Sequence, residues 1–408
     1  MVNSNKHDSL PVPGQAALAH SQTLTARIVA ALDAAGGWLP FDRYMELALY
    51  EPGLGYYSGG ATKFGWRGDD GSDFITAPEL SPLFAQTIGR AVAEALALSQ
   101  THAVMEFGAG TGKLAAGILT TLETLGAQCE RYTIVELSGE LRERQQATLA
   151  AAAPQWLDRV EWLSELPAQF DGVMLGNEVL DAMPVKLYQR SAGVWHERGV
   201  VQAPPAGDLH HQSGAEQVLR WADQLLSEPA PELSALLGGI EGEHDYLTET
   251  CDAAAAFTAT VLKLLGRGAL LLIDYGFPRH EYLHPQRAGG TLMCHYRHRA
   301  HDDPFLYPGL QDITAHVDFT AIAEAGLATG ADLLGYTSQA RFLINSGITE
   351  LLSQFDPQDT RHFLPAANAV QKLLSEAEMG ELFKVIGFGR GIDGTLAGFA
   401  RGDRSHAL

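Results

Sequence analysis

The fold of this 408-residue chain is decided by the stretch Glu106-Phe-Gly108-Ala-Gly110-Thr-Gly112. It follows the short apolar run AVMEF (103–107) and opens a segment with helical spacing of apolar residues. Glycines at such a junction let the backbone turn tightly and approach a ligand, and the start of the helix presents free N–H groups. A strand, a glycine loop and a helix in this order predict a nucleotide-type cofactor. The alternative is that the glycines serve the turn alone.

The surroundings of these glycines narrow the type of ligand. Their G-x-G-x-G spacing differs from the G-x-G-x-x-G that places a pyrophosphate, and no Lys-Ser/Thr pair follows, as a P-loop requires. Glu106, two positions before Gly108, would repel a phosphate and attract an ammonium group. Glu136 ends the next predicted strand, 24 residues after Gly112, where a carboxylate can accept hydrogen bonds from two ribose hydroxyls. These features favour S-adenosyl-L-methionine over a dinucleotide.

Short strands and helices alternate after Thr101, which is typical of a parallel sheet with crossover helices. This pattern predicts an α/β fold with a Rossmann-like core. The strands are predicted at 103–107, 131–136, 159–163, 171–176 and 268–274, and the helices at about 112–125, 139–153 and 253–266.

The segments outside this core are predicted from turn and capping signals. Residues 15–35 have helical spacing and stop at two glycines, and a Gly- and Tyr-rich loop follows at 51–71. In Thr76-Ala-Pro78-Glu79, a threonine three residues before a glutamate predicts a capping box that opens a helix over 78–98.

Two further segments are predicted from their length and pattern. The interval 183–250 is too long for a simple connection, so it is predicted to be an insertion. We expect a hairpin around 191–193 and an acidic helix near 215–227 within it. The tail, 337–408, is predicted to hold several helices and a strand pair near 382–388 and 395–400.

The fourth predicted strand runs into Gly176-Asn177-Glu178-Val-Leu-Asp181. Ligands of doubly wound sheets bind at the carboxyl ends of strands, so Asn177, Glu178 and Asp181 are candidate catalytic residues. A carboxylate can hold a guanidinium by charge-assisted hydrogen bonds and orient one nitrogen toward a methyl donor, and an amide carbonyl can accept from an N–H nucleophile. The alternative is that Asn177 caps a helix whose dipole favours the nearby acids.

Composition excludes several classes of protein. With 46% hydrophobic and 19% charged residues the chain is predicted to be globular. Its net charge of −21 argues against nonspecific nucleic-acid binding, and no apolar run has the length of a membrane span. Three widely spaced cysteines and an N-terminus without a targeting pattern predict a reducing, cytoplasmic setting.

The charge is unevenly distributed. Residues 208–252 hold ten acidic residues and one basic residue, a net charge of −9, whereas 279–301 hold four arginines and five histidines against one acid. These stretches are interpreted as two surfaces or as two lobes around one cleft. The acidic stretch could attract an arginine-bearing protein, and the alternative is that it serves solubility.

The histidines within 294–301 are candidate metal ligands, but their pattern argues against a metal site. Their H-x-x-H-x-x-H spacing does not place three imidazoles on one helix face, and two interspersed arginines oppose a cation. The segment is interpreted as a basic surface loop or as a cover over the site of the candidate catalytic acids. His316 and Asp318 precede another amphipathic helix and are predicted to have capping or core roles.

Several blocks together resemble a known family. EFGAGTG (106–112) with VELS (135–138) resembles class I S-adenosyl-L-methionine-dependent methyltransferases in general. The chain is similar to the MidA family, the mitochondrial complex I assembly methyltransferases and their bacterial relatives, from about residue 36 to 390. The blocks that carry this resemblance are FDRYMELALYEPGLGYYS (41–58), DFITAPELSPLF (73–84), GNEVLDAMPV (176–185), IDYG (273–276) and PGLQDITAHVDF (308–319).

The resemblance implies a role for each candidate residue. Glu106, Gly108, Gly110 and Gly112 would contact the methionine part of the cofactor, and Glu136 its ribose. The block containing Thr76, Pro78 and Glu79 would lie near the cofactor, and Asn177, Glu178 and Asp181 would face the acceptor. The implied organisation is an N-terminal helical and loop extension (1–100), a first core half (101–185), an acidic insertion (186–250), a second core half (251–336) and a helical C-terminal region (337–408).

We therefore predict an enzyme that transfers a methyl group from S-adenosyl-L-methionine to an arginine nitrogen of a protein. The family resemblance points to a subunit of respiratory complex I as the partner. No transit-peptide pattern is present, which favours the bacterial cytoplasm, and 66–72 is longer than the usual lead-in to its block. The alternatives are a small-molecule methyltransferase and a non-enzymatic assembly protein on the same fold.

Overall fold

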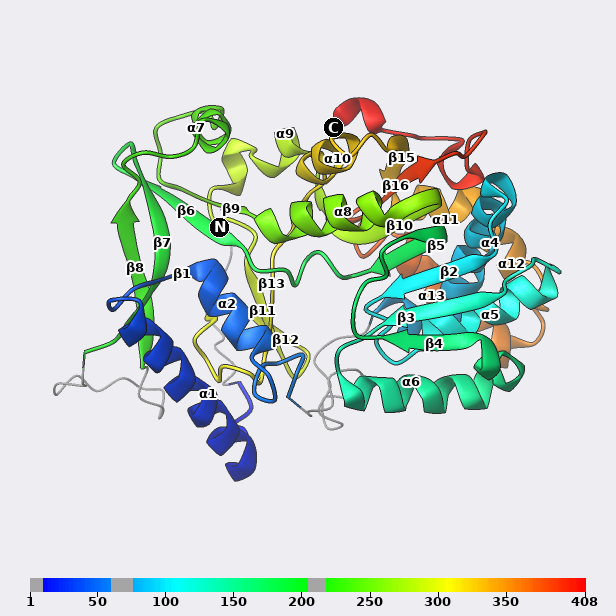
Figure 1. The fold of residues 1–408 in the computed structure, drawn as a ribbon, viewed down its shortest axis with the longest axis horizontal. Coiled ribbons are helices and arrows are strands. Elements are labelled where there is room, and N and C mark those ends of the chain that lie inside the picture. Colours follow the sequence, from blue (N-terminus) through cyan, green and yellow to red (C-terminus); the bar gives the residue numbers. More distant parts are fainter. Residues whose placement is uncertain (1–9, 60–75, 205–217) are drawn as a thin grey trace. The chain divides into compact units, whose positions relative to one another are not determined.

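The computed structural model describes residues 10–59, 76–204 and 218–408 (Figure 1). The chain divides into two compact units, each formed by three separate segments. Unit 1 comprises residues 1–74, 182–250 and 283–315, and unit 2 comprises 75–181, 251–282 and 316–408.

Unit 2 is built on one sheet with the strand order β15-β16-β10-β5-β2-β3-β4, and β14 pairs with the end of β10. The five strands from β4 to β10 are parallel, whereas β16 runs antiparallel to both β10 and β15. This confirms the predicted α/β core. The strands are β2 (Ala103–Phe107), β3 (Arg131–Val135), β4 (Val160–Leu163), β5 (Phe170–Asn177), β10 (Leu265–Phe277), β14 (Val317–Asp318), β15 (Asp332–Ser338) and β16 (Phe383–Arg390).

Residues 268–274 of β10 are all buried, without the alternation of a half-exposed strand, because helices cover both faces of this sheet. Helix α4 packs against β5 and β10 and against α5, while α8 and α10 pack against each other and β10 (Figure 1). The helices of unit 2 are α3 (Ala77–Leu80), α4 (Pro82–Ser99), α5 (Lys113–Thr124), α6 (Gly139–Ala152), α8 (Asp252–Leu264), α9 (Arg279–Tyr282), α10 (Phe319–Leu327), α11 (Gln339–Asn345), α12 (Ile348–Leu352) and α13 (Thr360–Leu374), with 3-10 turns at Pro154–Arg159, Ala397–Phe399 and Ser405–Ala407.

The single helix predicted over 78–98 is wrong, since the chain forms α3 and α4 with a break at Ser81. Ser81 is extended, with φ −154° and ψ 132°, and its hydroxyl accepts the Leu83 N–H at 3.2 Å. Proline at position 82 disfavours helical geometry in the residue before it but suits the first turn of a new helix. The sequence Ser81-Pro82 therefore ends one helix and starts the next.

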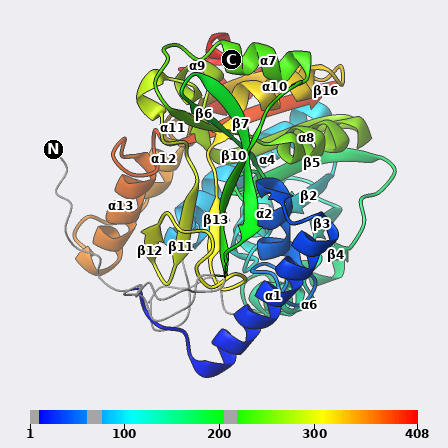
Figure 2. The same cartoon turned by 90° about the vertical axis from the view of Figure 1, so that its left-hand side faces the viewer.

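Unit 1 contains a sheet in the order β1-β7-β6-β9, with β8 on β7, and a three-stranded sheet β12-β11-β13 whose members lie side by side (Figure 2). Its helices α1 and α2 confirm the predicted N-terminal helix and add a second. The elements are α1 (Gln15–Ala34), β1 (Leu39–Pro40), α2 (Phe41–Tyr50), β6 (Lys186–Ser191), β7 (Val194–Gln202), β8 (Leu219–Leu225), α7 (Pro231–Gly238), β9 (Tyr246–Thr250), a 3-10 turn at Pro285–Arg287, β11 (Met293–Tyr296), β12 (Arg299–His301) and β13 (Asp312–Thr314).

The insertion differs in part from its prediction. The hairpin at 191–193 is confirmed as the β6–β7 turn, with Ala192 and Gly193 at positive φ. The acidic helix near 215–227 is wrong: 219–225 is strand β8, paired with β7, and 215–217 lie outside the described residues. The helix of this segment is α7, where Pro231 at the first turn is compatible with helix geometry.

The predicted C-terminal strand pair is also corrected. The strand at 383–390 is confirmed, but it pairs with β10 and β15, and 397–399 form a 3-10 turn. Phe399 packs against Phe342 and stays buried, so the apolar 395–400 pattern reflects core packing of a turn. Within the residues that the structure describes, no helix combines the length and the apolarity of a membrane span.

Candidate functional site

The glycine loop joins β2 to α5 and adopts a conformation that few other residues tolerate. Gly108 and Gly112 have φ values of +65° and +85°. A Cβ on Gly108 would lie 2.6 Å from Val179 Cγ1, and one on Gly112 would lie 3.1 Å from Gln145 Cα. Both the backbone conformation and the packing therefore require glycine at these two positions.

Glu106 lies within β2 and not on the loop surface. Its side chain is 1% exposed, and Oε2 accepts a 2.6 Å hydrogen bond from the Tyr132 hydroxyl. Burial raises the pKa of Glu106 to about 7, and the hydrogen bond from Tyr132 partly opposes this shift. A direct contact between this carboxyl and a ligand ammonium remains a prediction.

Glu136 directly follows β3, and two donors fix its carboxylate. Oε1 accepts the Ser138 N–H at 2.9 Å, and Oε2 accepts Gln145 Nε2 at 3.1 Å. A carboxylate has about four acceptor positions, so two remain for hydroxyls of a ligand. Leu137, the next residue, is 80% exposed and offers an apolar surface beside the carboxylate. Sequence reasoning did not identify Gln145 or Leu137.

Replacing Glu136 with alanine should weaken cofactor binding by about 10- to 100-fold, because its predicted hydrogen bonds to ribose would be lost. The free energy of unfolding should fall by about 1–3 kcal/mol, because the buried Gln145 amide loses an acceptor. Calorimetric titration with S-adenosyl-homocysteine measures the affinity, and thermal unfolding measures the stability. Unchanged affinity would refute the ribose role of Glu136.

The loop after β5 is tied to the end of β10. The Glu178 N–H donates to the Ile273 carbonyl at 2.8 Å, and Glu178 adopts φ +55°. Asp274, fully buried in the carboxyl-terminal half of β10, accepts three backbone N–H groups through Oδ2. These donors are Val179 at 3.1 Å, Leu180 at 2.8 Å and Asp181 at 3.3 Å. Asp274 therefore holds the loop in place, and it was not among the predicted site residues.

No helix follows Asn177, so the alternative role as a helix cap is wrong. Asn177 Nδ2 donates to Glu178 Oε1 at 2.9 Å, while Asn177 Oδ1 is buried without a hydrogen-bond partner among the described residues. A buried amide oxygen without a donor is costly, and native structures retain one chiefly where a ligand or water can satisfy it. The three predicted acceptor residues thus lie together on one turn.

Burial, and after it the charge of Asp181, raises the pKa of two carboxyl groups at this turn, Glu178 and Asp274. Burial, reinforced by the charge of Asp181, raises the pKa of Glu178 to about 8, while hydrogen bonds from Asn177 and from the Ala77 N–H oppose the shift. Burial and Asp181 also raise the pKa of Asp274 well above its ordinary value. A cluster of buried acids with raised pKa values is typical of sites that hold a cation or accept a proton.

Helix α3 connects this turn to the glycine loop. The predicted capping box is wrong, because the Thr76 side chain makes no capping hydrogen bond although Pro78 lies in the first turn. The buried Glu79 carboxylate instead accepts the Thr111 hydroxyl and the Lys113 ammonium, both beside the glycine loop. The Ala77 N–H donates to Glu178 at the other end of α3. Whether Thr76, Pro78 and Glu79 also contact the cofactor remains a prediction.

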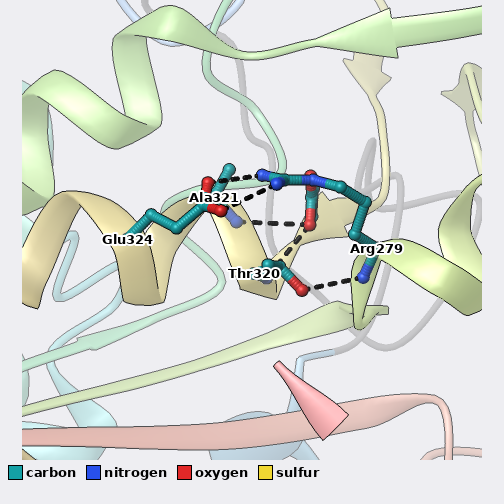
Figure 3. Close-up of polar contacts among 5 residues, drawn as sticks. Arg279, Thr320, Ala321 and Glu324 are labelled. Atoms are coloured by element: carbon teal, nitrogen blue, oxygen red, sulfur yellow. Dashed lines mark hydrogen bonds and ion pairs between the residues drawn. The ribbon is translucent and has the colours of Figure 1, made fainter. Parts of the chain in front are cut away.

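The predicted structural roles of His316 and Asp318 are confirmed. Asp318 caps α10 by accepting the Thr320 and Ala321 N–H groups at 3.0 and 3.3 Å, and His316 packs against the ring of Phe277. Arg279 donates to Asp318 at 3.0 Å and to both oxygens of Glu324 at 2.8 and 2.7 Å (Figure 3). This cluster fixes the segment after β10 to α10.

The acidic stretch at 208–252 and the basic stretch at 279–301 each contain both buried and paired side chains. The last part of the basic stretch, residues 293–301, forms the β11–β12 hairpin, where burial lowers the pKa of His295 and His301. Among the described residues, no three His, Cys, Asp or Glu side chains form a group that could hold a metal ion. In the acidic stretch, Glu249 is buried and accepts the Thr291 N–H at 2.7 Å, and Asp223 pairs with Arg198. The stretch is therefore not a uniform solvent-facing surface.

Comparison with known proteins identifies one family. A family model described as "Putative S-adenosyl-L-methionine-dependent methyltransferase" matches residues 87–337. A crystal structure of a Burkholderia thailandensis protein bound to S-adenosyl-homocysteine is 64% identical, with a TM-score of 0.92 over 98% of this chain and 100% of that chain. A native crystal structure from the same organism is 61% identical, with a TM-score of 0.88 over the same shares.

Curated relatives are more distant. The mitochondrial protein arginine methyltransferase NDUFAF7 of Danio rerio is 27% identical over 86% of this chain and 83% of its own length. The Mus musculus protein of the same name is 29% identical over 83% of this chain and 78% of its own length.

Proposed function

The chain belongs to the MidA family of S-adenosyl-L-methionine-dependent methyltransferases, and from this premise we propose that it methylates an arginine nitrogen of a protein. S-adenosyl-L-methionine is its cofactor. The arginine specificity is supported by the names of the NDUFAF7 relatives and by three neighbouring carboxyl groups, of which those of Asp181 and Asp274 are buried and that of Glu178 is partly exposed. We place the protein in the bacterial cytoplasm as part of this proposal, because two solved structures more than 60% identical to it come from a bacterium.

The residues of unit 2 fit the cofactor. The glycine loop would accept close approach of the methionine part, Glu136 would accept hydrogen bonds from the ribose, and exposed Leu137 would contact the purine. The cofactor supplies a methyl group already activated on a sulfonium. The task of the protein is therefore to orient the acceptor nitrogen and to relieve its charge.

The turn at 177–181 has the groups for this task. The Glu178 carboxylate would bind the guanidinium through charge-assisted hydrogen bonds, and Asn177 Oδ1 would accept from a further N–H. Methylation of a guanidinium nitrogen displaces one proton. Glu178 and Asp181 lie close enough to raise the pKa of Glu178, so this pair would accept that proton more readily than an ordinary carboxylate.

The proposal is tested by incubating the enzyme and methyl-labelled S-adenosyl-L-methionine with whole extract, proteins and small molecules together, from cells that lack the gene. Labelled methylarginine after acid hydrolysis supports the proposal, and mass spectrometry then identifies the protein, a complex I subunit being the first to examine. Label in small molecules alone would indicate a small-molecule methyltransferase. Cofactor binding without any transfer would favour a non-enzymatic assembly role.

Methyl transfer by the wild-type enzyme should rise with pH through about 8, because only ionised Glu178 can hold a guanidinium and burial raises the pKa of this residue to about 8. Below that pH the carboxyl is mostly neutral, and raising the pH removes the proton. Initial rates at saturating cofactor from about pH 6 to about pH 9.5 give the profile. A rate that is flat or falls across this range would contradict the role of Glu178.

A further inference from the structure

Gln145 is a fully buried amide in a helix with little apolar surface. Only Gln145 and Leu149 are buried in α6, and the exposed fraction of Gln145 is 0%. Burying an amide is unfavourable unless its hydrogen bonds are replaced. The hydrogen bonds that the Gln145 amide makes inside the protein therefore indicate why it is buried.

The amide makes three hydrogen bonds that join separate parts of the cofactor site. Nε2 donates to the Gly110 carbonyl at 3.1 Å and to Glu136 Oε2 at 3.1 Å. Oε1 accepts the indole N–H of Trp162, on β4, at 2.9 Å. Both amide hydrogens are thus used, one on the glycine loop and the other on the carboxylate.

The orientation of the amide follows from its partners. An indole N–H can only donate, so Oε1 must face Trp162, and the Gly110 carbonyl and the Glu136 carboxylate then both face the NH₂ group. The opposite orientation would leave all three contacts mismatched. Trp162 therefore fixes the direction in which Gln145 donates.

Two further contacts of α6 add to the link between the glycine loop and Glu136. Arg142, one turn earlier, donates from Nε to the Glu136 carbonyl at 2.8 Å, and Gln145 Cα lies against Gly112. The helix thus contacts the glycine loop on one side and both the main chain and the side chain of Glu136 on the other.

We propose that Gln145 is a positioning residue that holds the glycine loop and the Glu136 carboxylate in the relative arrangement needed to bind the cofactor. The amide satisfies one acceptor position of Glu136 and leaves others for the ribose. This inference rests on the ribose role of Glu136 and is independent of the nature of the methyl acceptor.

The test is calorimetric titration of S-adenosyl-homocysteine into Gln145→Leu, in the wild-type background and in the Glu136→Ala background. In the wild-type background the affinity should fall about 10- to 100-fold, because the carboxylate and the loop lose their common donor. In the Glu136→Ala background the same substitution should have a smaller effect, because only the hydrogen bond to the Gly110 carbonyl is then lost. An equal loss in both backgrounds would indicate a merely structural role, and wild-type affinity in Gln145→Leu would overturn the proposal. Loss of affinity in Gln145→Leu with none in Glu136→Ala would refute the ribose role instead.

Two further variants keep the test informative if Gln145→Leu does not fold. Gln145→Glu keeps the acceptor for Trp162 but places a second carboxyl against Glu136, so the affinity should be low at neutral pH and recover as the pair takes up a proton at lower pH. The other charged side chain beside this pair is Arg142, which donates to the Glu136 carbonyl. Gln146→Leu is the matched control, because Gln146 is an exposed glutamine on the same helix and its loss should leave the affinity unchanged. A pH-independent affinity in Gln145→Glu would count against the proposal.

Discussion

Replacing Glu178 with glutamine should reduce methyl transfer by about 100- to 10,000-fold while the affinity for S-adenosyl-homocysteine changes by less than about threefold. Glutamine keeps the shape and the left-handed backbone of the turn but removes the negative charge that would hold the guanidinium and accept its proton. The contacts that would bind the cofactor lie on Glu136 and the glycine loop and are not altered by this substitution.

The measurement is the initial rate of label transfer at saturating cofactor, together with calorimetric titration of S-adenosyl-homocysteine. Glu94→Gln is the matched control: burial raises the pKa of Glu94 too, but its carboxylate accepts the Ala397 N–H and is not part of the turn at 177–181. That variant should keep its transfer rate. If Glu178→Gln retained its activity, the catalytic role of Glu178 would be refuted and its role would be structural.

Replacing Asp274 with alanine should lower both the stability and the methyl-transfer activity. Three N–H groups of the loop at 179–181 would lose their shared acceptor, and each buried donor left unpaired costs about 1–3 kcal/mol. Part of this is recovered by relaxation and water, so we expect the free energy of unfolding to fall by about 3–5 kcal/mol. The loop would no longer hold Glu178 in its position, and the transfer rate of the folded fraction should fall by about 100-fold or more.

Chemical denaturation measures the stability of Asp274→Ala, and transfer assays well below its unfolding temperature measure the activity. Asp274→Asn should recover part of both, because its amide oxygen can still accept from the loop. Glu249→Ala is the control from unit 1: Glu249 is also buried and accepts backbone N–H groups of Thr291 and Leu292, so this variant should lose stability without losing activity per folded molecule. If Asp274→Ala were destabilised but fully active, Asp274 would have no part in positioning Glu178.

The core of the fold was predictable because its signals are local. The apolar runs at 103–107 and 171–176, the glycine loop and the helical spacing between them each depend on a few neighbouring residues, and the strands lie where they were predicted. Predictions failed where a distant segment decides the conformation. The 219–225 segment is a strand because it pairs with β7, and Glu79 is not a capping residue because Thr111 and Lys113 bind its carboxylate.

In the candidate site, too, residues with local signals were predicted and residues that depend on distant contacts were not. The sequence indicated Glu136, Asn177, Glu178 and Asp181, because chemistry-bearing residues at strand ends can be recognised from one strand at a time. It did not indicate Asp274 as the residue that holds the turn, since its three donors lie more than 90 positions away along the chain.

The sequence by itself therefore determined the α/β core, the cofactor class and the turn that carries the candidate catalytic acids, because each is encoded by residues that are neighbours along the chain. Only the tertiary structure decided how those parts are held. In the sequence Gln145 is an ordinary glutamine of a polar helix, yet the pairing of β3 with β4 brings Trp162 to one side of it and Glu136 to the other. The glycine loop completes that environment, and the resulting burial leaves the amide three bonds and one orientation.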